Sequence, residues 1–172
     1  NNMEKKQTHV PYGFVLGIIM VIVGLVIYLT GLAFKPGMQW ISYIPFLIGI
    51  ILNANAYSKA NEGYITFGNA FGSGFKASMV VAIVMVAYAI ATIFIFPEMK
   101  ERILKMQHDE MVKNPKVTEE AIDMAQSMTK KFWNVFLIAG SVVSTLFMGA
   151  IFSLIGAAVA SKKGERPITD NF

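Results

Sequence analysis

Four long uncharged stretches divide the chain, and every Lys, Arg, Asp and Glu lies between or beyond them. The stretches cover residues 10–34, 36–58, 77–97 and 132–161. An α-helix rises about 1.5 Å per residue, so about 20 apolar residues cross the hydrocarbon core of a bilayer. The pattern therefore predicts an all-α integral membrane protein, a bundle of four transmembrane helices over about residues 10–34, 38–57, 77–96 and 132–160.

The first two links between these helices differ in character. The first is short and contains the pair Pro36-Gly37, which is typical of a tight turn, so the first two helices should form an antiparallel hairpin. The second link, residues 59–76, is rich in glycine and in phenylalanines that recur every four residues, on one helical face. We expect an interfacial helix here, capped by Thr66, that runs into the third span.

The third link, residues 98–131, holds seven acidic and seven basic side chains. Pro115 divides it, which predicts an amphipathic helical hairpin between the third and fourth spans. Thr118 is a good N-cap for the second helix of this hairpin. We expect that helix to continue unbroken into the fourth span, and the polar tail from residue 161 to residue 172 to fray.

The composition agrees with a single membrane domain over residues 1–172. Apolar residues make up 55% of the chain and charged residues 15%, against about 25% charged in an average soluble protein. The net charge is +4, but basic residues beside the spans indicate anchors at anionic lipid headgroups rather than contacts with nucleic acid. The absence of cysteine excludes a disulfide framework. The first apolar run is too long for a cleaved signal peptide, so we interpret it as a retained helix.

Four spans place both tails and the second link on one side of the membrane. Seven basic residues lie on that side and eight on the other, so the positive-inside rule discriminates weakly. The seven lie in short links and tails, whereas several of the eight lie in the middle of the polar hairpin. We therefore expect both termini in the cytoplasm.

Small residues recur along the first and fourth spans, where they allow helix backbones to approach closely. In the fourth span they stand at every fourth position, as Ser141, Thr145, Gly149, Ser153 and Ala157. In the first span they are Gly13, Gly17, Gly24 and Gly31. We predict that these two helices make the closest contacts, with each other or with a partner subunit. The two interpretations are ordinary packing within the bundle and a docking surface for another membrane protein.

No ionisable side chain lies within the predicted spans, although such groups usually mark transporters and proton relays. Asn53 and Asn55 are polar, but they lie two residues apart and face different ways on a helix; hydrogen bonding between helices or a polar binding site could use them. His108 lies among methionines, which are soft ligands for copper(I). Methionine is also an ordinary filler of apolar helix faces, so we expect no metal and no cofactor.

The glycines before Lys76 do not form a phosphate-binding loop, since that loop needs Lys and then Ser or Thr directly after its last glycine. We instead expect contact between lipid and the interfacial residues Lys59, Phe67, Phe71, Phe75 and Lys76. The carboxylate pairs at 109–110 and 119–120 diverge on a helix and cannot share a proton. No catalytic set is readable, so an enzyme is not expected.

Three segments resemble one family of proteins. They are Tyr-Gly-Phe-Val-Leu-Gly at 12–17, Gly-Tyr-Ile-Thr-Phe-Gly-Asn-Ala-Phe at 63–71, and the Phe-Pro stop at 96–97 that opens the polar hairpin. In this order they resemble the domain-of-unknown-function family 4199, small four-helix membrane proteins of bacteria that are common in Bacteroidota. The resemblance covers nearly the whole chain and implies a bacterial inner membrane and four spans. It brings no established activity and no catalytic residues.

We expect a non-enzymatic accessory or scaffold component that packs against a membrane partner or associates with itself, surrounded by lipid. One alternative is a small transporter or channel with an uncharged polar path. The other is a lipid-interacting protein that uses the second link and the polar hairpin. A water-filled path lined by Asn53, Asn55, Thr145 or Ser153 would favour transport, and a dry, tight interior would favour the scaffold.

Overall fold

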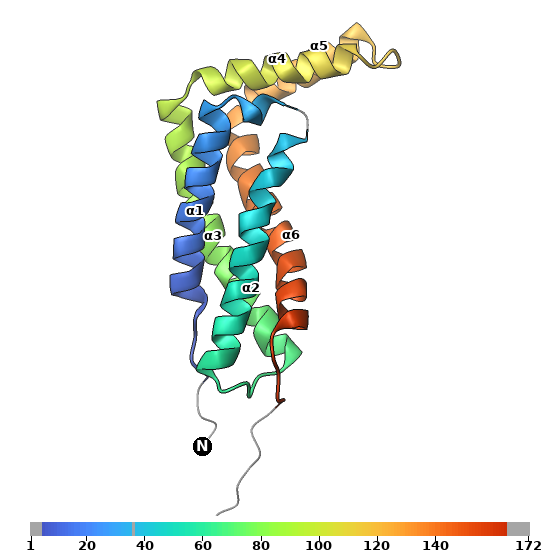
Figure 1. Cartoon of the computed structure of the whole chain (residues 1–172). Helices are drawn as coiled ribbons and strands as arrows, with labels where there is room; N and C mark the ends of the chain where they lie inside the picture. Colours follow the sequence, from blue (N-terminus) through green and yellow to red (C-terminus); the bar gives the residue numbers. More distant parts are fainter. Residues whose placement is uncertain (1–4, 36, 165–172) are drawn as a thin grey trace, which may run out of the picture.

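The computed structural model of the 172-residue chain describes residues 5–35 and 37–164. Every regular element in this part is a helix, so the predicted all-helical class is confirmed. Four helices form a bundle: α1 (His9–Leu29), α2 (Tyr43–Ala60), α3 (Phe67–Ile95) and α6 (Trp133–Val159). Two more lie across one end of it, α4 (Glu98–Val112) and α5 (Glu119–Lys131) (Figure 1). The short 3₁₀ helices η1 (Leu32–Phe34) and η2 (Met38–Ser42) connect α1 to α2.

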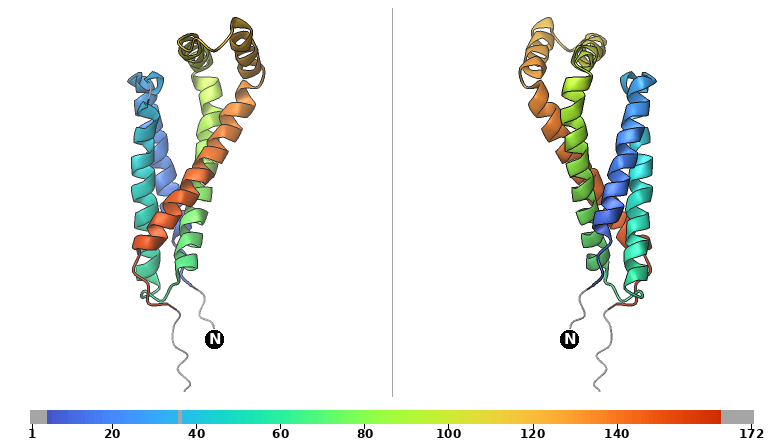
Figure 2. Two further views of the ribbon diagram at one scale, coloured as in Figure 1. Left: turned by 90° about the vertical axis from the view of Figure 1, so that its right-hand side faces the viewer. Right: turned by 90° about the vertical axis from the view of Figure 1, so that its left-hand side faces the viewer.

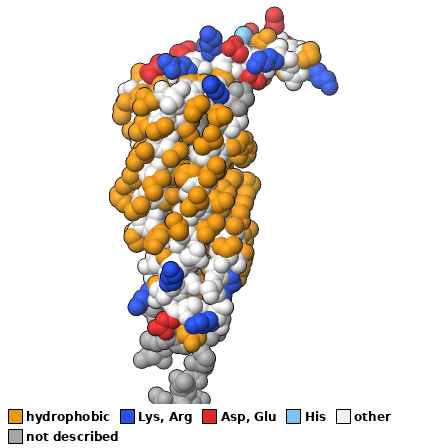
Figure 3. Space-filling model, viewed as in Figure 1, with side chains coloured by type: hydrophobic (Ala, Val, Ile, Leu, Met, Phe, Trp, Pro, Cys, Tyr) orange, Lys and Arg blue, Asp and Glu red, His pale blue; other side chains and the backbone are white. Residues whose placement is uncertain are grey.

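Four helices are long and apolar enough to cross a membrane, as the sequence predicts: α1, α2 together with part of η2, α3 and α6. On the face that Figure 3 shows, their outer side chains form an apolar belt, and charged side chains gather at its two ends. Ile83 is 71% exposed and Phe94 is 79% exposed within this belt. Monomeric soluble proteins rarely expose so large a continuous apolar surface, whereas lipid covers it without cost.

The two ends of the bundle are different. At one end, called here the terminal end, lie the described parts of both tails and the link 61–66 (Figure 1). At the other, the hairpin end, lie η1, η2 and the α4–α5 hairpin. Figure 2 shows the α1–α2 pair and the α3–α6 pair meeting near the terminal end and diverging toward the hairpin end.

The start of α3 fits the prediction for the second link. The interfacial helix and the third span are one continuous helix, which Thr66 caps. The Thr66 hydroxyl accepts from the Asn69 N–H at 3.2 Å, and the Asn69 side-chain oxygen accepts from the Thr66 N–H at 3.1 Å. This reciprocal capping box satisfies two backbone donors that a helix start leaves free.

The end of α1 and the start of α6 differ from the prediction. The first span is shorter than expected, because Gly31 adopts φ +74° and turns the chain into η1. Helix α5 does not continue into α6, because Phe132 leaves the helical conformation at φ −107° and ψ 19°. The break lets α5 fold back along α4, where Leu104 and Ile122 become buried. Gln126 also donates across the pair to the Leu104 carbonyl at 2.7 Å. Burial between two amphipathic helices thus replaces an unbroken rod.

Helix α3 is the centre of the bundle. Its most extensive contacts are with α6 and then with α1, while α2 packs on α6, α3 and α1. The expected pairing of α1 with α6 is therefore wrong within this chain, since the small residues of α1 lie against α3 and those of α6 lie against α3 and α2. A Cβ at Gly13 would lie 2.7 Å from the Ala77 carbonyl oxygen, and one at Gly17 would lie 2.8 Å from the Val84 Cβ. Spacing alone identifies a packing face but not the helix that it meets.

Candidate functional site

A buried polar network joins three helices at the terminal end. The Asn53 side chain of α2 is 0% exposed. Its amide nitrogen donates to the Ser73 hydroxyl of α3 at 3.1 Å, and its oxygen accepts from the Thr8 hydroxyl, just before α1, at 2.9 Å. A buried amide whose oxygen and nitrogen both have partners holds these helices together.

Two further buried hydroxyls bond to their own helices. Ser153, 1% exposed, donates to the Gly149 carbonyl at 2.6 Å, and Ser78, 0% exposed, donates to the Gly74 carbonyl at 3.1 Å. Thr145 is 8% exposed, and Asn55 is partly exposed. Three of the four residues that we would expect to line a polar path, Asn53, Thr145 and Ser153, are thus closed off in this conformation.

The small residues of α6 divide into two groups. In the half toward the terminal end they are packed: a Cβ at Gly149 would overlap the Ser78 side chain, one at Gly156 would lie 3.3 Å from the Ala54 Cβ, and Ala157 is 0% exposed. In the half toward the hairpin end, Gly140 has open space where a Cβ would stand and Ser144 is exposed. Ser141 lies beside them, partly exposed.

The hairpin-end half of α6 is therefore largely uncovered. Among residues 133–148 only Thr145 is buried. Val143 is 67% exposed and Phe147 is 65% exposed. We call the surface formed by Gly140, Val143, Ser144 and Phe147 the outer α6 face. It combines apolar side chains with small residues that nothing in the described chain contacts closely.

The glycines of α1 also differ among themselves. Gly13 and Gly17 are buried against α3, and a Cβ at Gly24 would lie 3.4 Å from the Tyr88 ring. Gly31 lies outside α1, in the turn before η1, with open space around it. Its contribution is the positive φ angle of the turn rather than helix packing.

The residues expected at the lipid interface gather at the terminal end of α2 and α3. Lys59 and Lys76 are exposed, as is Phe67. Phe71 and Phe75 are partly exposed, and their rings stack with centroids 6.0 Å apart.

Both tails are tied to the link 61–66, which the sequence did not indicate. Lys6 and Asn61 exchange two hydrogen bonds of 3.0 Å. The Lys163 N–H donates to the Gly63 carbonyl at 2.7 Å, and the Ser58 hydroxyl donates to the Ser161 carbonyl at 2.5 Å. Residues 161–164 of the tail are therefore held rather than frayed, and residues 165–172 lie outside the described part.

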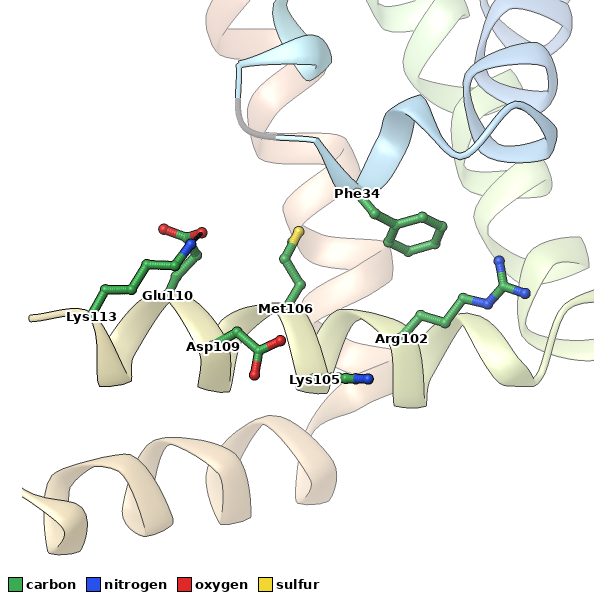
Figure 4. Close-up of a pocket in the computed structure, with 7 residues that line it drawn as sticks. All are labelled: Phe34, Arg102, Lys105, Met106, Asp109, Glu110 and Lys113. Carbon is green, nitrogen blue, oxygen red and sulfur yellow. Dashed lines mark hydrogen bonds and ion pairs between the residues drawn. The ribbon is translucent and has the colours of Figure 1, made fainter.

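A groove opens at the hairpin end, between η1 and α4. Its volume is about 420 Å³. Phe34 forms one wall, and residues on successive turns of α4 form the other: Arg102, Lys105, Met106, Asp109, Glu110 and Lys113 (Figure 4). The Arg102 guanidinium carbon lies 5.6 Å from the centre of the Phe34 ring, a cation–π distance. A smaller cavity of about 170 Å³ lies where the ends of α3, α4 and α6 meet.

Helix α4 is fixed against the end of α1. The Tyr28 hydroxyl donates to a Glu98 carboxylate oxygen at 2.6 Å, and the Tyr28 ring lies 4.7 Å from that of Phe96. The hydrogen bond from Tyr28, then a hydrogen bond from the backbone N–H of Glu98 and the positive charge of Arg102, hold the pKa of Glu98 below its ordinary 4.5. Further along α4, the Lys113 ammonium donates to Glu110 at 2.6 Å, which raises the pKa of Lys113.

Sequence analysis predicted an amphipathic hairpin over residues 98–131 but not the groove beside it. One signal was present: Arg102, Lys105 or Met106, Asp109 and Lys113 follow each other at helical spacing, so they share a face of α4. The opposite wall comes from Phe34, about 70 residues earlier, and no local pattern connects the two.

Metal binding receives no support from the side chains that the structure describes. Within residues 5–35 and 37–164, no three His, Asp or Glu side chains are grouped to hold an ion. His108 is exposed and lies 3.5 Å from Asp109.

Comparison with known proteins identifies a family. The family model described as "Protein of unknown function (DUF4199)" matches residues 11–162, most of the chain. No curated protein and no solved structure matches the chain.

Proposed function

Since the chain belongs to the DUF4199 family of proteins of unknown function, we propose from its own structure that it is a non-enzymatic accessory protein that binds a membrane partner. The contact surface in this proposal is the outer α6 face. The partner is another membrane protein or a second copy of this chain, and neither a nucleic acid nor a cofactor takes part.

The observation that carries the proposal is the contrast along α6. Small residues in a lipid-exposed helix give no advantage in contact with lipid, but they permit close approach of another helix. Gly149 already has such a neighbour in Ser78, whereas a Cβ at Gly140 would meet nothing within 4 Å. A partner helix seated on the outer α6 face would give Gly140 and Ser144 the contact that Gly149 has within the bundle.

Transport through a polar path is the weaker alternative. Asn53 and Ser153, two of the side chains that such a path would need, are closed and hydrogen-bonded. The two cavities of about 420 and 170 Å³ lie at the hairpin end rather than along the bundle axis. These features fit a packed component better than a conduit.

The experiment is purification from the native host in mild detergent, followed by identification of proteins that co-purify. Gly140→Leu should abolish the partner's recovery without reducing the yield of the chain itself, because its side chain meets open space. Ala87→Leu, a small-to-large change at an exposed position of α3, is the matched control and should keep the partner. Recovery of the wild-type chain as a lone monomer, or full retention of the partner by Gly140→Leu, would contradict the proposal.

The proposed location is the bacterial inner membrane, with both termini in the cytoplasm. Because the chain has no cysteine, one introduced thiol reports its own side of the membrane. Asn114→Cys, exposed at the tip of the α4–α5 hairpin, should react with an impermeant reagent added to intact cells. Lys59→Cys, exposed at the terminal end, should react only after lysis. The reverse pattern would invert the topology.

A further inference from the structure

We propose that the groove between Phe34 and α4 binds the phosphate group of a membrane phospholipid. This inference concerns the hairpin end and is independent of the outer α6 face. It assigns a ligand to a site that the sequence motifs did not reveal.

The position of the groove suits a lipid headgroup. Helix α1 ends at Leu29 and α3 at Ile95, and the walls of the groove follow directly, in η1 and in α4. Helix α4 lies across the end of the bundle rather than along it (Figure 1). If the four apolar helices cross the bilayer, η1 and α4 lie in the headgroup layer, with the groove between them.

The groove has two cationic groups available for an anion. Within the described residues, neither Arg102 nor Lys105 has a carboxylate within 4.0 Å. Two carboxylates also line the groove, Asp109 and Glu110. Glu110 is paired with Lys113 at 2.6 Å, and Asp109 lies 3.5 Å from His108. Glu98, at the start of α4, accepts from Tyr28 at 2.6 Å. A guanidinium can bind two phosphate oxygens at once, and a lysine one turn further adds a second charge.

The apolar part of the groove favours a lipid over a soluble phosphate. Phe34 and Met106 are partly exposed, and Met106 extends toward the Phe34 side (Figure 4). A phosphate ion gains nothing from an aromatic ring and a thioether, whereas the glycerol and first methylenes of a lipid do. The volume of about 420 Å³ falls within the usual range for small-ligand sites.

The walls are held in place before any ligand binds. Tyr28 contacts both of them: its ring lies 5.9 Å from Phe34 and its hydroxyl donates to Glu98 at the start of α4. Arg102 in turn rests over the Phe34 ring. A site whose walls are fixed loses less conformational entropy on binding.

The test compares two lipids that differ only in the headgroup. The full chain in non-ionic detergent is titrated with phosphatidylglycerol or with diacylglycerol of the same acyl chains, and bound lipid is counted by native mass spectrometry. Wild type should retain phosphatidylglycerol and release diacylglycerol. Arg102→Gln/Lys105→Gln should weaken phosphatidylglycerol retention about tenfold or more, because it removes two charge-assisted contacts.

The control is Lys116→Gln/Lys130→Gln, which removes the same charge from exposed positions of the hairpin outside the groove. It should retain phosphatidylglycerol as wild type does. If both double variants lose phosphatidylglycerol retention equally, the retention reflects the overall charge of the hairpin rather than a site in the groove, and the proposal is overturned. Displacement of the lipid by an equal concentration of soluble glycerophosphate would also overturn it, by assigning the groove to a free phosphate ester.

A second measurement maps the position of the lipid. Phosphatidylglycerol with a photoreactive headgroup should label residues 102–113 of α4 in wild type, and Arg102→Gln/Lys105→Gln should lose that label. Labelling confined to the terminal end, beside Lys59 and Lys76, would move the headgroup contact away from the groove and contradict the proposal.

Discussion

The two halves of the bundle use the same kinds of residue in different ways. Near the terminal end, α6 packs its glycines on α2 and α3, and an amide–hydroxyl network closes the interior. Near the hairpin end, α6 has only one buried residue between 133 and 148, and an open groove lies under α4. The comparison indicates that close packing is concentrated in the terminal half, whereas the hairpin half leaves uncovered the two surfaces that our proposals use.

The most direct test of the difference between the two halves is to introduce the same side chain into both halves of α6. Gly149→Leu should destabilise the bundle by about 1–3 kcal/mol, because the new Cβ would overlap the Ser78 side chain between packed helices. Gly140→Leu should leave stability unchanged or raise it by up to about 1 kcal/mol through helix propensity. Thermal unfolding in detergent measures both. Equal losses would show that the halves do not differ.

Removing the buried amide tests the terminal half alone. Asn53→Ala leaves the Thr8 and Ser73 hydroxyls without their partner, so a loss of about 1–3 kcal/mol is expected. Asn55→Ala, at a partly exposed position two residues on, is the matched control and should cost less. The same thermal unfolding assay compares the two variants. An unfolding midpoint of Asn53→Ala equal to that of wild type would show that the network does not stabilise the bundle.

A substitution in the α4–α5 hairpin should destabilise the hairpin without affecting the rest of the bundle. Gln126→Ala removes the hydrogen bond to the Leu104 carbonyl and should weaken α4–α5 docking by about 1 kcal/mol. Hydrogen exchange should then accelerate in α4 and α5 but not in α2 or in the terminal half of α6. Acceleration throughout the bundle would mean that the two ends unfold as one unit.

The smallest expected effect is a shift in the pKa of Glu98. The hydrogen bond from Tyr28 lowers the pKa of Glu98 below 4.5. This hydrogen bond therefore stabilises the folded state fully above pH 4.5, and the stabilisation is lost as the pH falls through the lowered pKa. Tyr28→Phe should move the pKa of Glu98 back toward 4.5. Carboxyl-carbon NMR of labelled glutamate measures this, with Glu101 on the same helix as an internal reference. If the pKa of Glu98 is unchanged in Tyr28→Phe, Tyr28 is not the cause of its lowered value.

Helix identity and the order of elements could be predicted because each follows from local chemistry. The lack of charge over some 20 residues requires an apolar surrounding, and a Thr66–Asn69 capping box lies within four residues of chain. The break at Phe132 could not be predicted, since nothing in the neighbouring residues forbids a helix there. It depends on the burial of Leu104 in α4 and of Ile122 in α5, which requires α5 to fold back along α4.

The sequence by itself determined that this chain has four apolar helices, a polar hairpin and a family of unknown function, because periodicity and charge act over neighbouring residues. Only the tertiary structure decided that α3, rather than α6, receives the glycines of α1. It also decided that Phe34 faces Arg102 across a groove and that Gly140 is left uncovered where Gly149 is packed. A glycine is the same residue at both positions, and its role depends on whether another helix lies against it.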